Sequence, residues 1–326
     1  MEGTGTKDKT IGVIGTFVSD LIEPYGGTPT RSLGGIYYTV TYLAAMFDKG
    51  WTIRPVARVG ADIYERVVAS CARHAQVDVS QLHLEERPNT QVRLTYLTEN
   101  VRQEVTTEPM APLSWDQVQG VIDADVVLVN FITGEELSPT SFASLSEKAK
   151  GLIYTDYHSL AWARDASGRR SLWKNPHWEL YVSCADIVQM NEHEAASLME
   201  ISPPLPLQAL RELARQVLQG RARMVLVTLA ERGAFVGERT GTGIRSDLVP
   251  AWPVERVVDP TGCGDAFAAA FLRHYLANSD TRAAVEFANR VASINCTLLG
   301  AENIEAMKRE LAQIESGGRC GKERST

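Results

Sequence analysis

The chain has 326 residues, of which 44% are hydrophobic and 22% are charged, and this composition is typical of a globular protein with one large domain or two modest ones. Its formal net charge of -7 argues against a nucleic-acid-binding surface, which would normally be basic. The apolar runs are shorter than the roughly 20 residues of a membrane-spanning helix, so we expect no membrane association.

The five cysteines are scattered along the chain, and no Cys-x-x-Cys pair occurs among them. Their spacing favours neither a zinc site nor a disulfide framework. The first ten residues lack the apolar core of a signal peptide. We therefore expect reduced thiols and a cytoplasmic location.

Residues 1–10 and 316–326 are rich in Gly, Ser, Thr and charged residues, so we expect two flexible termini. Between them the sequence contains neither a low-complexity linker nor an internal repeat, which favours a single domain over residues 11–315. The apolar run at residues 11–15 predicts a buried strand.

The following segments predict a small β-sheet lid. Residues 23–35 are punctuated by Gly and Pro, and residues 92–96 alternate apolar with polar side chains. Such alternation is the period of a strand with one wet face, and a turn at Glu99-Asn100 would lead into a second strand. We place this lid at residues 16–35 and 90–110.

From about residue 121 the pattern changes to short apolar runs separated by helical segments. The runs span residues 125–131, 151–156, 185–191 and 223–230, and an apolar stripe over residues 207–218 predicts an amphipathic helix. This alternation predicts a mainly parallel sheet covered by helices on both faces. Ligands bind at the carboxyl ends of such strands, so the polar residues to inspect are Asn130, Asp156, Asn191 and Thr228. His158, just beyond one strand, is either a substrate contact or an incidental loop residue.

The segment from residue 257 to residue 276 brackets a Gly-rich string between two aspartates. Asp259 is followed by Pro260-Thr261-Gly262-Cys263-Gly264 and then by Asp265, directly before a long apolar-patterned segment. Proline and two glycines predict a tight loop that leads into a helix near Gly264. The first N–H groups of a helix lack partners, and its dipole adds partial positive charge. We expect the backbone N–H groups of Gly262, Cys263 and Gly264 to form an anion cradle, with Asp265 beside it.

This arrangement suits phosphoryl transfer. The cradle would stabilise charge on the transferring phosphate, and Asp265 would accept the proton of the attacking hydroxyl. We expect this carboxylate to keep an ordinary pKa near ~4, because a helix N-terminus favours its ionised form. On these residues alone, a simple turn with a charge at a helix N-terminus stays open.

The full string DPTGCGDAF resembles the signature of the ribokinase-like (PfkB-type) carbohydrate and nucleoside kinases, and the resemblance extends from about residue 11 to residue 304. It implies a three-layer α/β/α sandwich with a central, mainly parallel sheet and a small β-sheet lid. It also implies an ATP- and magnesium-dependent kinase whose partner is a small-molecule sugar or nucleoside. Relatives are monomers or homodimers.

Two further stretches resemble the family's acceptor site. IGVIGTFVSDLI resembles its first strand and the aspartate that follows, and LGGIYYT resembles its Gly-Gly-x-x-x-Asn motif. The resemblance implies that the substrate is bound by Asp20, Gly34, Gly35 and Thr39. Thr39 stands where the family usually has Asn, and its hydroxyl offers one donor where an amide nitrogen offers two. The neighbouring Tyr37 and Tyr38 are either substrate contacts or core residues.

Three stretches resemble the family's nucleotide site: NEHEAASL, VTLAERGAFV and FANRVASI. They imply that ATP is bound by Asn191, Thr228, Glu231, Gly233 and Asn289, and that Glu194 holds magnesium through water. A polar helix start without a ligand is the alternative for Asn191 and Glu194. Ala230 stands where the family more often has Gly. Asp259 and Thr261 match residues that hold a monovalent cation in relatives, and use of potassium stays open.

The alternative function is a catalytically silent ligand-binding or regulatory protein on the same fold. The presence of Asp265 with its cradle argues against it. The Gly-x-Gly-x-x-Gly fingerprint is absent after the first strand, which disfavours a nicotinamide-dependent dehydrogenase, and no Gly-x-x-x-x-Gly-Lys-Ser/Thr occurs, which disfavours a P-loop kinase.

Overall fold

The computed structural model describes residues 8–97, 102–298, 304–310 and 312. Most of the two termini that we expect to be flexible lies outside the described residues, and so does the turn expected at Glu99-Asn100.

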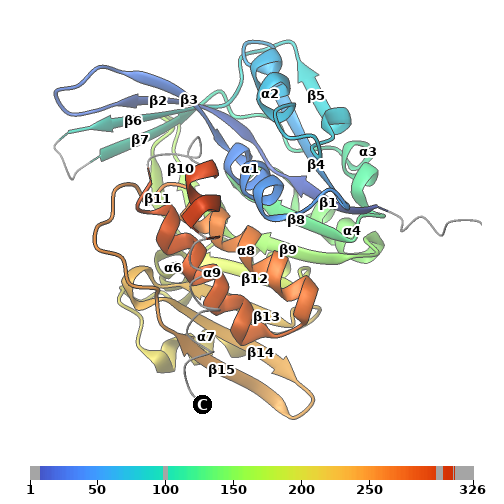
Figure 1. The fold of residues 1–326 in the computed structure, drawn as a ribbon, viewed down its shortest axis with the longest axis vertical. Helices are drawn as coiled ribbons and strands as arrows, with labels where there is room; N and C mark the ends of the chain where they lie inside the picture. The colour runs from blue at the N-terminus through green and yellow to red at the C-terminus, as the bar shows by residue number, and fades with distance from the viewer. Residues whose placement is uncertain (1–7, 98–101, 299–303, 311, 313–326) are drawn as a thin grey trace, which may run out of the picture.

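A nine-stranded sheet forms the centre of the molecule, with the order β15-β14-β13-β12-β9-β8-β1-β4-β5 (Figure 1). The strands from β5 to β13 in this order pair in parallel, and β14 and β15 continue the sheet antiparallel. The strands are β1 (Lys9–Ile14), β4 (Trp51–Gly60), β5 (Leu82–Glu85), β8 (Val126–Asn130), β9 (Leu152–Asp156), β12 (Ile187–Asn191), β13 (Met224–Thr228), β14 (Ala234–Thr240) and β15 (Gly243–Val249). The four apolar runs after residue 121 are therefore β8, β9, β12 and β13, as predicted.

Helices cover both faces of this sheet. Alternate residues of one strand point to opposite faces, so Leu128 of β8 joins one buried cluster while Val127 and Val129 join the other. The first cluster contains residues of α1 (Ile36–Met46), α2 (Tyr64–Cys71), α8 (Cys263–Asn278) and α9 (Thr281–Asn295). The second contains residues of α3 (Trp115–Val118), α4 (Pro139–Lys148), α5 (Trp178–Ser183), α6 (Glu192–Met199) and α7 (Leu207–Val217). The predicted three-layer α/β/α sandwich is confirmed.

A small separate sheet extends from one end of the sandwich (Figure 1). Its order is β3-β2-β6-β7, and its strands are β2 (Phe17–Glu23), β3 (Thr30–Gly35), β6 (Gln91–Tyr96) and β7 (Arg102–Thr107). An additional hairpin of β10 (Trp162–Arg164) and β11 (Arg170–Leu172) supports it, because Thr106 N–H donates to Gly168 O at 3.0 Å and Arg170 pairs with Glu104 at 2.7 Å. The sequence patterns do not predict this hairpin.

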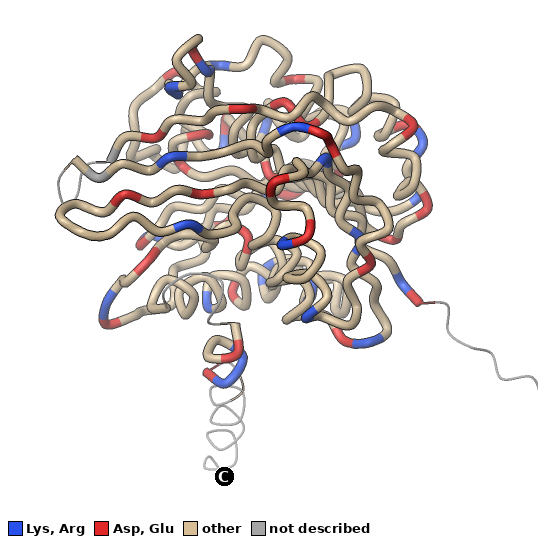
Figure 2. Tube along the Cα trace, turned by 90° about the horizontal axis from the view of Figure 1, so that it is seen from above, with Lys and Arg blue, Asp and Glu red and all other residues tan. Residues whose placement is uncertain are grey.

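The described residues contain no helix with the length and apolarity of a membrane span. In the view of Figure 2, acidic and basic residues are interspersed along the described chain, and the two signs do not separate onto different sides.

The turn between β13 and β14 contains a residue in a strained conformation. Ala230 begins the short 3₁₀ helix at residues 230–232 with a φ of 49°, which lies in the left-handed region, and its side chain is exposed. Gly233 follows with a φ of 91°, and a Cβ there would lie 2.0 Å from the Val249 carbonyl oxygen. The turn therefore requires glycine at residue 233 and favours it at residue 230.

We predict that Ala230→Gly stabilises the protein. The left-handed conformation costs alanine about 1–2 kcal/mol, which exceeds the entropic cost of glycine, so the free energy of unfolding should rise by about 0.5–1 kcal/mol. Chemical denaturation followed by circular dichroism would measure it. The matched control is Ala72→Gly, at an exposed position with a φ of -62°, which should lower stability instead. Equal losses in both variants would contradict strain at Ala230.

Candidate active site

Polar side chains meet where the central parallel strands end. Asn130 ends β8 and is the register partner of Asp156, which ends β9, and Asn191 of β12 is the partner of Thr228 of β13. The start of α8 lies at the same edge, because Gln189 Nε2 donates to the Gly264 carbonyl at 3.1 Å. The edge that the sequence indicates as the ligand site therefore also receives the Gly-rich loop.

The loop into α8 is held by two tyrosines of α1. Gly262 precedes the helix with a φ of 75°, and a Cβ there would lie 2.7 Å from Tyr38 Cδ1 and 3.1 Å from Tyr42 Oη. Both the left-handed backbone conformation and the close approach of the tyrosines require glycine at residue 262. Tyr42 Oη donates to Asn295 Oδ1 at 2.5 Å, and Asn295 Nδ2 donates to the Thr261 carbonyl at 3.2 Å. The loop is thus fixed between α1 and the end of α9.

The expected cradle is only partly free of protein acceptors. The backbone N–H of Cys263 donates to the Pro260 carbonyl at 3.2 Å, which closes a turn and removes one of the three expected donors. Within the described part of the chain, no acceptor is in hydrogen-bonding position to the N–H groups of Gly262 and Gly264. Two amides at the positive end of a 16-residue helix are therefore the donors that an anion would meet.

Asp265 lies in the first turn of α8 and is held by two buried side chains. Thr39 Oγ1 donates to Asp265 Oδ1, and Asn130 Nδ2 donates to the same oxygen at 3.0 Å and to Thr39 Oγ1 at 3.1 Å. Both bonds reach Oδ1, and neither occupies Oδ2. The carboxylate is therefore fixed in orientation while one oxygen is left out of this network.

The pKa of Asp265 differs from the expected value near ~4. Burial raises it to about 6, and the Thr39 hydrogen bond and the charge of His158 limit the rise. The helix N-terminus does not offset this desolvation. Asp265 is still mostly ionised at neutral pH, and it is a stronger base than an ordinary aspartate.

His158 carries a positive charge beside this edge. His158 lies on the turn after β9, and its Nδ1 is 3.3 Å from Glu194 Oε1. Burial alone would lower the pKa of His158, but the hydrogen bond to Glu194 and the charges of Glu194 and Asp156 raise it to about 9. Burial and Glu194 in turn raise the pKa of Asp156. His158 therefore interacts with the acidic residues of the strand edge.

Asn191 and Glu194 form a reciprocal cap at the start of α6. Asn191 Oδ1 accepts from the Glu194 N–H at 3.0 Å, and Glu194 Oε2 accepts from the Asn191 N–H at 2.8 Å. Asn191 Nδ2 also donates to Glu194 Oε1 at 2.6 Å, and Glu194 is buried. Both side chains thus have the helix-capping role that the sequence leaves as an alternative.

Asp20 lies in β2 next to the glycines of β3. A Cβ on Gly34 would lie 2.0 Å from Asp20 Oδ2, and one on Gly35, where φ is 63°, would lie 2.1 Å from the Thr16 carbonyl. Burial raises the pKa of Asp20 to about 7, and the charge of Glu104 adds to the rise. The structure thus brings together Asp20 and the two glycines that the sequence assigns to the acceptor.

Tyr38 connects this group with Asp265, whereas Tyr37 belongs mainly to the core. Burial raises the pKa of Tyr38, and the charges of Asp20, Asp259 and Asp265 raise it further, so Tyr38 lies within electrostatic range of all three. Tyr37 is 9% exposed and packs within the cluster beneath α1. Asp20 and Asp265 are therefore both near enough to Tyr38 for their charges to act on it.

The residues expected at the nucleotide differ in their surroundings. Thr228 is partly exposed at the strand edge and Glu231 is exposed, whereas Gly233 is buried in the turn. Asn289 is 6% exposed, and its Nδ2 donates to the carbonyls of Val249 and Pro250, both at 3.0 Å. Its amide hydrogens therefore hold the chain that follows β15.

The residues expected at a monovalent cation also have protein contacts. Asp259 Oδ1 accepts from the Thr261 N–H at 2.9 Å, and the Asp259 N–H donates to the Cys296 carbonyl at 3.1 Å. Among the residues that the structure describes, no group of three or more His, Cys, Asp or Glu side chains is arranged to hold a metal ion. Magnesium fits such a site only when phosphate and water supply most of its ligands.

Two amide side chains of the site were not assigned by the sequence patterns. Asn130 is marked there only by its place at a strand end, and its buried Oδ1 has no donor among the described residues. Gln189 accepts from Tyr154 Oη at 2.5 Å and donates to Asp156 Oδ2 at 3.2 Å, which connects β12 with β9 and α8. The sequence signal that could have identified Gln189 is its amide side chain between apolar residues in the middle of β12.

Comparisons with known proteins agree with this geometry. Residues 50–307 match the family described as pfkB family carbohydrate kinase. Ribokinase from Bacillus subtilis (strain 168) is 39% identical over 80 residues, which cover 24% of this chain and 27% of that protein. A nucleoside kinase from Methanothermobacter thermautotrophicus is 30% identical over 147 residues, which cover 44% of this chain and 43% of that protein. The chain thus spans less than half the length of these curated relatives.

The fold also resembles solved structures. Arabidopsis thaliana ribokinase, solved with ribose and ATP, superimposes with a TM-score of 0.71 at 18% sequence identity, over 93% of this chain and 99% of that one. At this identity the likeness concerns the fold. The family match covers most of the chain, from β4 through α9, and includes the Gly-rich loop with Asp265. The chain belongs to the pfkB family of carbohydrate kinases.

Proposed function

We propose that the protein transfers the γ-phosphoryl group of ATP to a hydroxyl group of a sugar or nucleoside. The observation that carries this proposal is the position of Asp265, beside two amides at the start of α8 for which no acceptor is found among the described residues. A base and an anion site in one helical turn are what in-line phosphoryl transfer requires. Membership of the pfkB family supports the same reaction class.

In the proposed reaction, the acceptor hydroxyl oxygen attacks the γ-phosphorus while its proton passes to Asp265. The bond from the γ-phosphorus to the bridging oxygen breaks, and ADP leaves. The N–H groups of Gly262 and Gly264 donate to the transferring group, and protonated His158 adds positive charge beside this edge. A positioned base contributes about 10²–10⁴-fold, and one donor to a developing oxyanion contributes about 10²–10³-fold.

The acceptor is proposed to lie between Asp20 and Asp265, next to Gly34 and Gly35 and under the small sheet. Thr39 then acts through Asp265, because its hydroxyl already donates to that carboxylate. Asn130 would supply the contact that the usual Asn makes, since its buried Oδ1 has no donor within the described segments. Closure of the small sheet would exclude water and limit wasteful hydrolysis of ATP.

The donor is proposed to lie along the other half of the edge, near Asn191, Thr228, Glu231, Gly233 and Asn289. Magnesium, held by the donor phosphates and water, would neutralise phosphate charge, with Glu194 as the residue that accepts from its water. Asp259 and Thr261 are the residues proposed for a monovalent cation such as potassium. Several of these groups already have protein contacts, so they would shape the site as well as bind the donor and its cations.

We predict that Asp265→Asn lowers kcat by about 10²-fold or more while acceptor binding changes little, because the variant cannot take up the proton. The measurement is ADP release over nucleosides, pentoses, hexoses, phosphorylated sugars and inositols, with and without potassium. Asparagine can accept the same two hydrogen bonds, so the variant should unfold no more easily than the wild type.

The matched control is Asp116→Asn, at an exposed position in the first turn of α3, which should keep wild-type turnover. Wild-type turnover in Asp265→Asn would remove this residue from the mechanism. Acceptor binding without ADP release by the unmodified protein, over the whole panel, would favour the silent ligand-binding alternative.

We predict that Thr39→Val moves the acid limb of the pH–rate profile to higher pH. In the wild type, kcat/KM should fall as the pH drops below about 6, because Asp265 becomes protonated. The Thr39 hydrogen bond lowers the pKa of Asp265, so its loss raises that pKa and reduces activity first on the acid side. Thr39→Ser keeps the hydroxyl and should keep the wild-type profile. An unchanged limb in Thr39→Val would refute the positioning role.

We predict that Asp20→Ala raises the KM of the acceptor by about tenfold or more and leaves the KM of ATP near its wild-type value, because a carboxylate binds and orients neighbouring hydroxyls. Steady-state kinetics with each substrate varied in turn would separate the two constants. Glu23→Gln, on the same strand, is the control and should change neither. A selective loss of ATP affinity would place Asp20 at the donor instead.

A further inference from the structure

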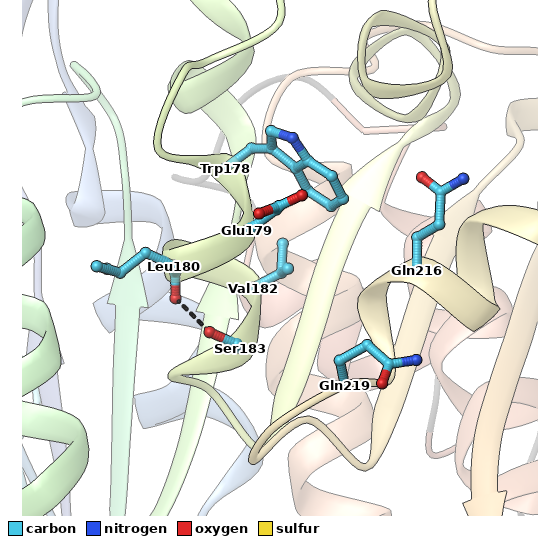
Figure 3. Close-up of a pocket in the computed structure, with 7 residues that line it drawn as sticks. All are labelled: Trp178, Glu179, Leu180, Val182, Ser183, Gln216 and Gln219. Carbon is cyan, nitrogen blue, oxygen red and sulfur yellow. Dashed lines mark hydrogen bonds between the residues drawn. The ribbon is translucent and has the colours of Figure 1, made fainter.

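Two pockets lie outside the candidate active site. The first, of about 490 Å³, lies between α5 and the end of α7, where Trp178, Glu179 and Gln216 surround it (Figure 3). Glu179 is the one charged residue among those that line it, and no buried unpaired polar atom is found there in the described structure. This pocket therefore offers a ligand few polar or charged groups that could bind it specifically.

The second pocket, of about 520 Å³, lies between α1, the turn after α2 and the helical segment 304–310. Tyr37, Thr41 and Ala44 line it from α1. Thr39 and Thr41 are two residues apart, which is a rotation of about 200° around a helix. Because Thr39 contacts Asp265, the pocket lies on the opposite side of α1 from the candidate active site.

Thr41, which lines this pocket, has a hydroxyl group without a partner in the described part of the chain. The residue is 2% exposed, and its Oγ1 is buried with no hydrogen-bond partner among the described residues. An unsatisfied buried hydroxyl costs about 1–3 kcal/mol, so such groups are rare in native structures without a reason. A bound molecule with an acceptor atom would satisfy it.

The charged residues around the pocket favour an anion. Arg73 and Lys308 line it together with Glu305, and Lys308 pairs with Glu305 at 3.0 Å, whereas Arg73 forms no ion pair with a described residue. His74 lies among them, and burial together with the charges of Lys308 and Arg73 lowers its pKa. The pocket is thus locally positive in a chain of net charge -7.

We propose that this pocket binds a phosphate group, either free phosphate or the phosphate of a small organic molecule. Arg73 and Lys308 supply charge-assisted donors, and Thr41 Oγ1 supplies a neutral one. The volume lies within the range of about 300–1,000 Å³ that is usual for small-molecule sites. Tyr37, Ala44 and Ile304 give the pocket an apolar wall for an organic portion. The site does not depend on the proposed kinase activity.

Histidine resonances give a site-specific test. In protein labelled at histidine, His74 reports on the pocket and His158 on the candidate active site, and His74→Gln assigns the first signal. Inorganic phosphate and glycerol phosphate are titrated separately. Either ligand should raise the pKa of His74, because a nearby anion favours the imidazolium form. Equal affinities identify free phosphate as sufficient, whereas tighter binding of glycerol phosphate identifies a phosphorylated molecule.

Variants test the proposed contacts. Arg73→Gln and Lys308→Gln should each weaken the His74 response by about tenfold, as expected for the loss of one charge-assisted contact. Arg309→Gln, exposed on the same segment and not part of the pocket, should leave the response unchanged. A response of the same affinity in Arg73→Gln, or a response at His158 without one at His74, would overturn the proposal.

Thr41→Val separates a binding role from a structural one. Valine has nearly the shape of threonine, and the hydroxyl has no partner among the residues that the structure describes, so the variant should be at least as stable as the wild type. We expect it to bind phosphate several-fold more weakly, whereas Thr41→Ser should bind like the wild type. If Thr41→Val gained stability and kept full phosphate affinity, the hydroxyl would be only an unsatisfied group, and the proposed contact would be refuted.

Discussion

The candidate site depends on the left-handed glycine at residue 262. Its conformation turns the chain sharply into α8, and the absence of a Cβ lets Tyr38 and Tyr42 pack against the loop. This packing fixes the start of α8 at the carboxyl edge of the sheet, where Asp265 meets Thr39 and Asn130. Any side chain at this position would meet both the backbone restriction and the tyrosine rings, so Asp265 and the N–H groups of Gly262 and Gly264 would move together.

The buried carboxylates at this edge of the sheet lower the stability of the folded protein when they are ionised. Burial raises the pKa values of Asp20 and Asp265, so their charged forms are less stable in the folded protein than in the unfolded chain. For Asp265, the folded-state pKa exceeds the unfolded one, so its contribution to stability is lost as the pH rises from about 4 through about 6. His158 carries the opposite charge and reduces this loss. The site is therefore least favourable for folding in the charge state that the proposed reaction uses, as is common for functional sites.

Helix α1 connects the two sites through its opposite sides. Thr39 reaches Asp265 from one side, and Thr41 lines the positive pocket from the other. A ligand held by Arg73 and Lys308 would add fixed contacts to the helix whose Thr39 orients Asp265. The helix is otherwise held by apolar packing, since Ile36, Val40 and Leu43 are buried in the same cluster as the inner residues of α8.

Local patterns determined much of the architecture. Apolar runs with intervening amphipathic helices predicted β8, β9, β12 and β13 and the layered fold. The Gly-rich string predicted the loop before α8. Both predictions were possible because backbone conformation and side-chain periodicity are properties of neighbouring residues. The antiparallel end of the sheet and the hairpin of β10 and β11 lacked such a signal. Only the tertiary structure decided that Thr39 donates to Asp265, since these residues are 226 positions apart and meet through the order of the strands. The same holds for the turn that occupies the Cys263 N–H and for the burial that raises the pKa of Asp265, because both depend on what packs around the loop.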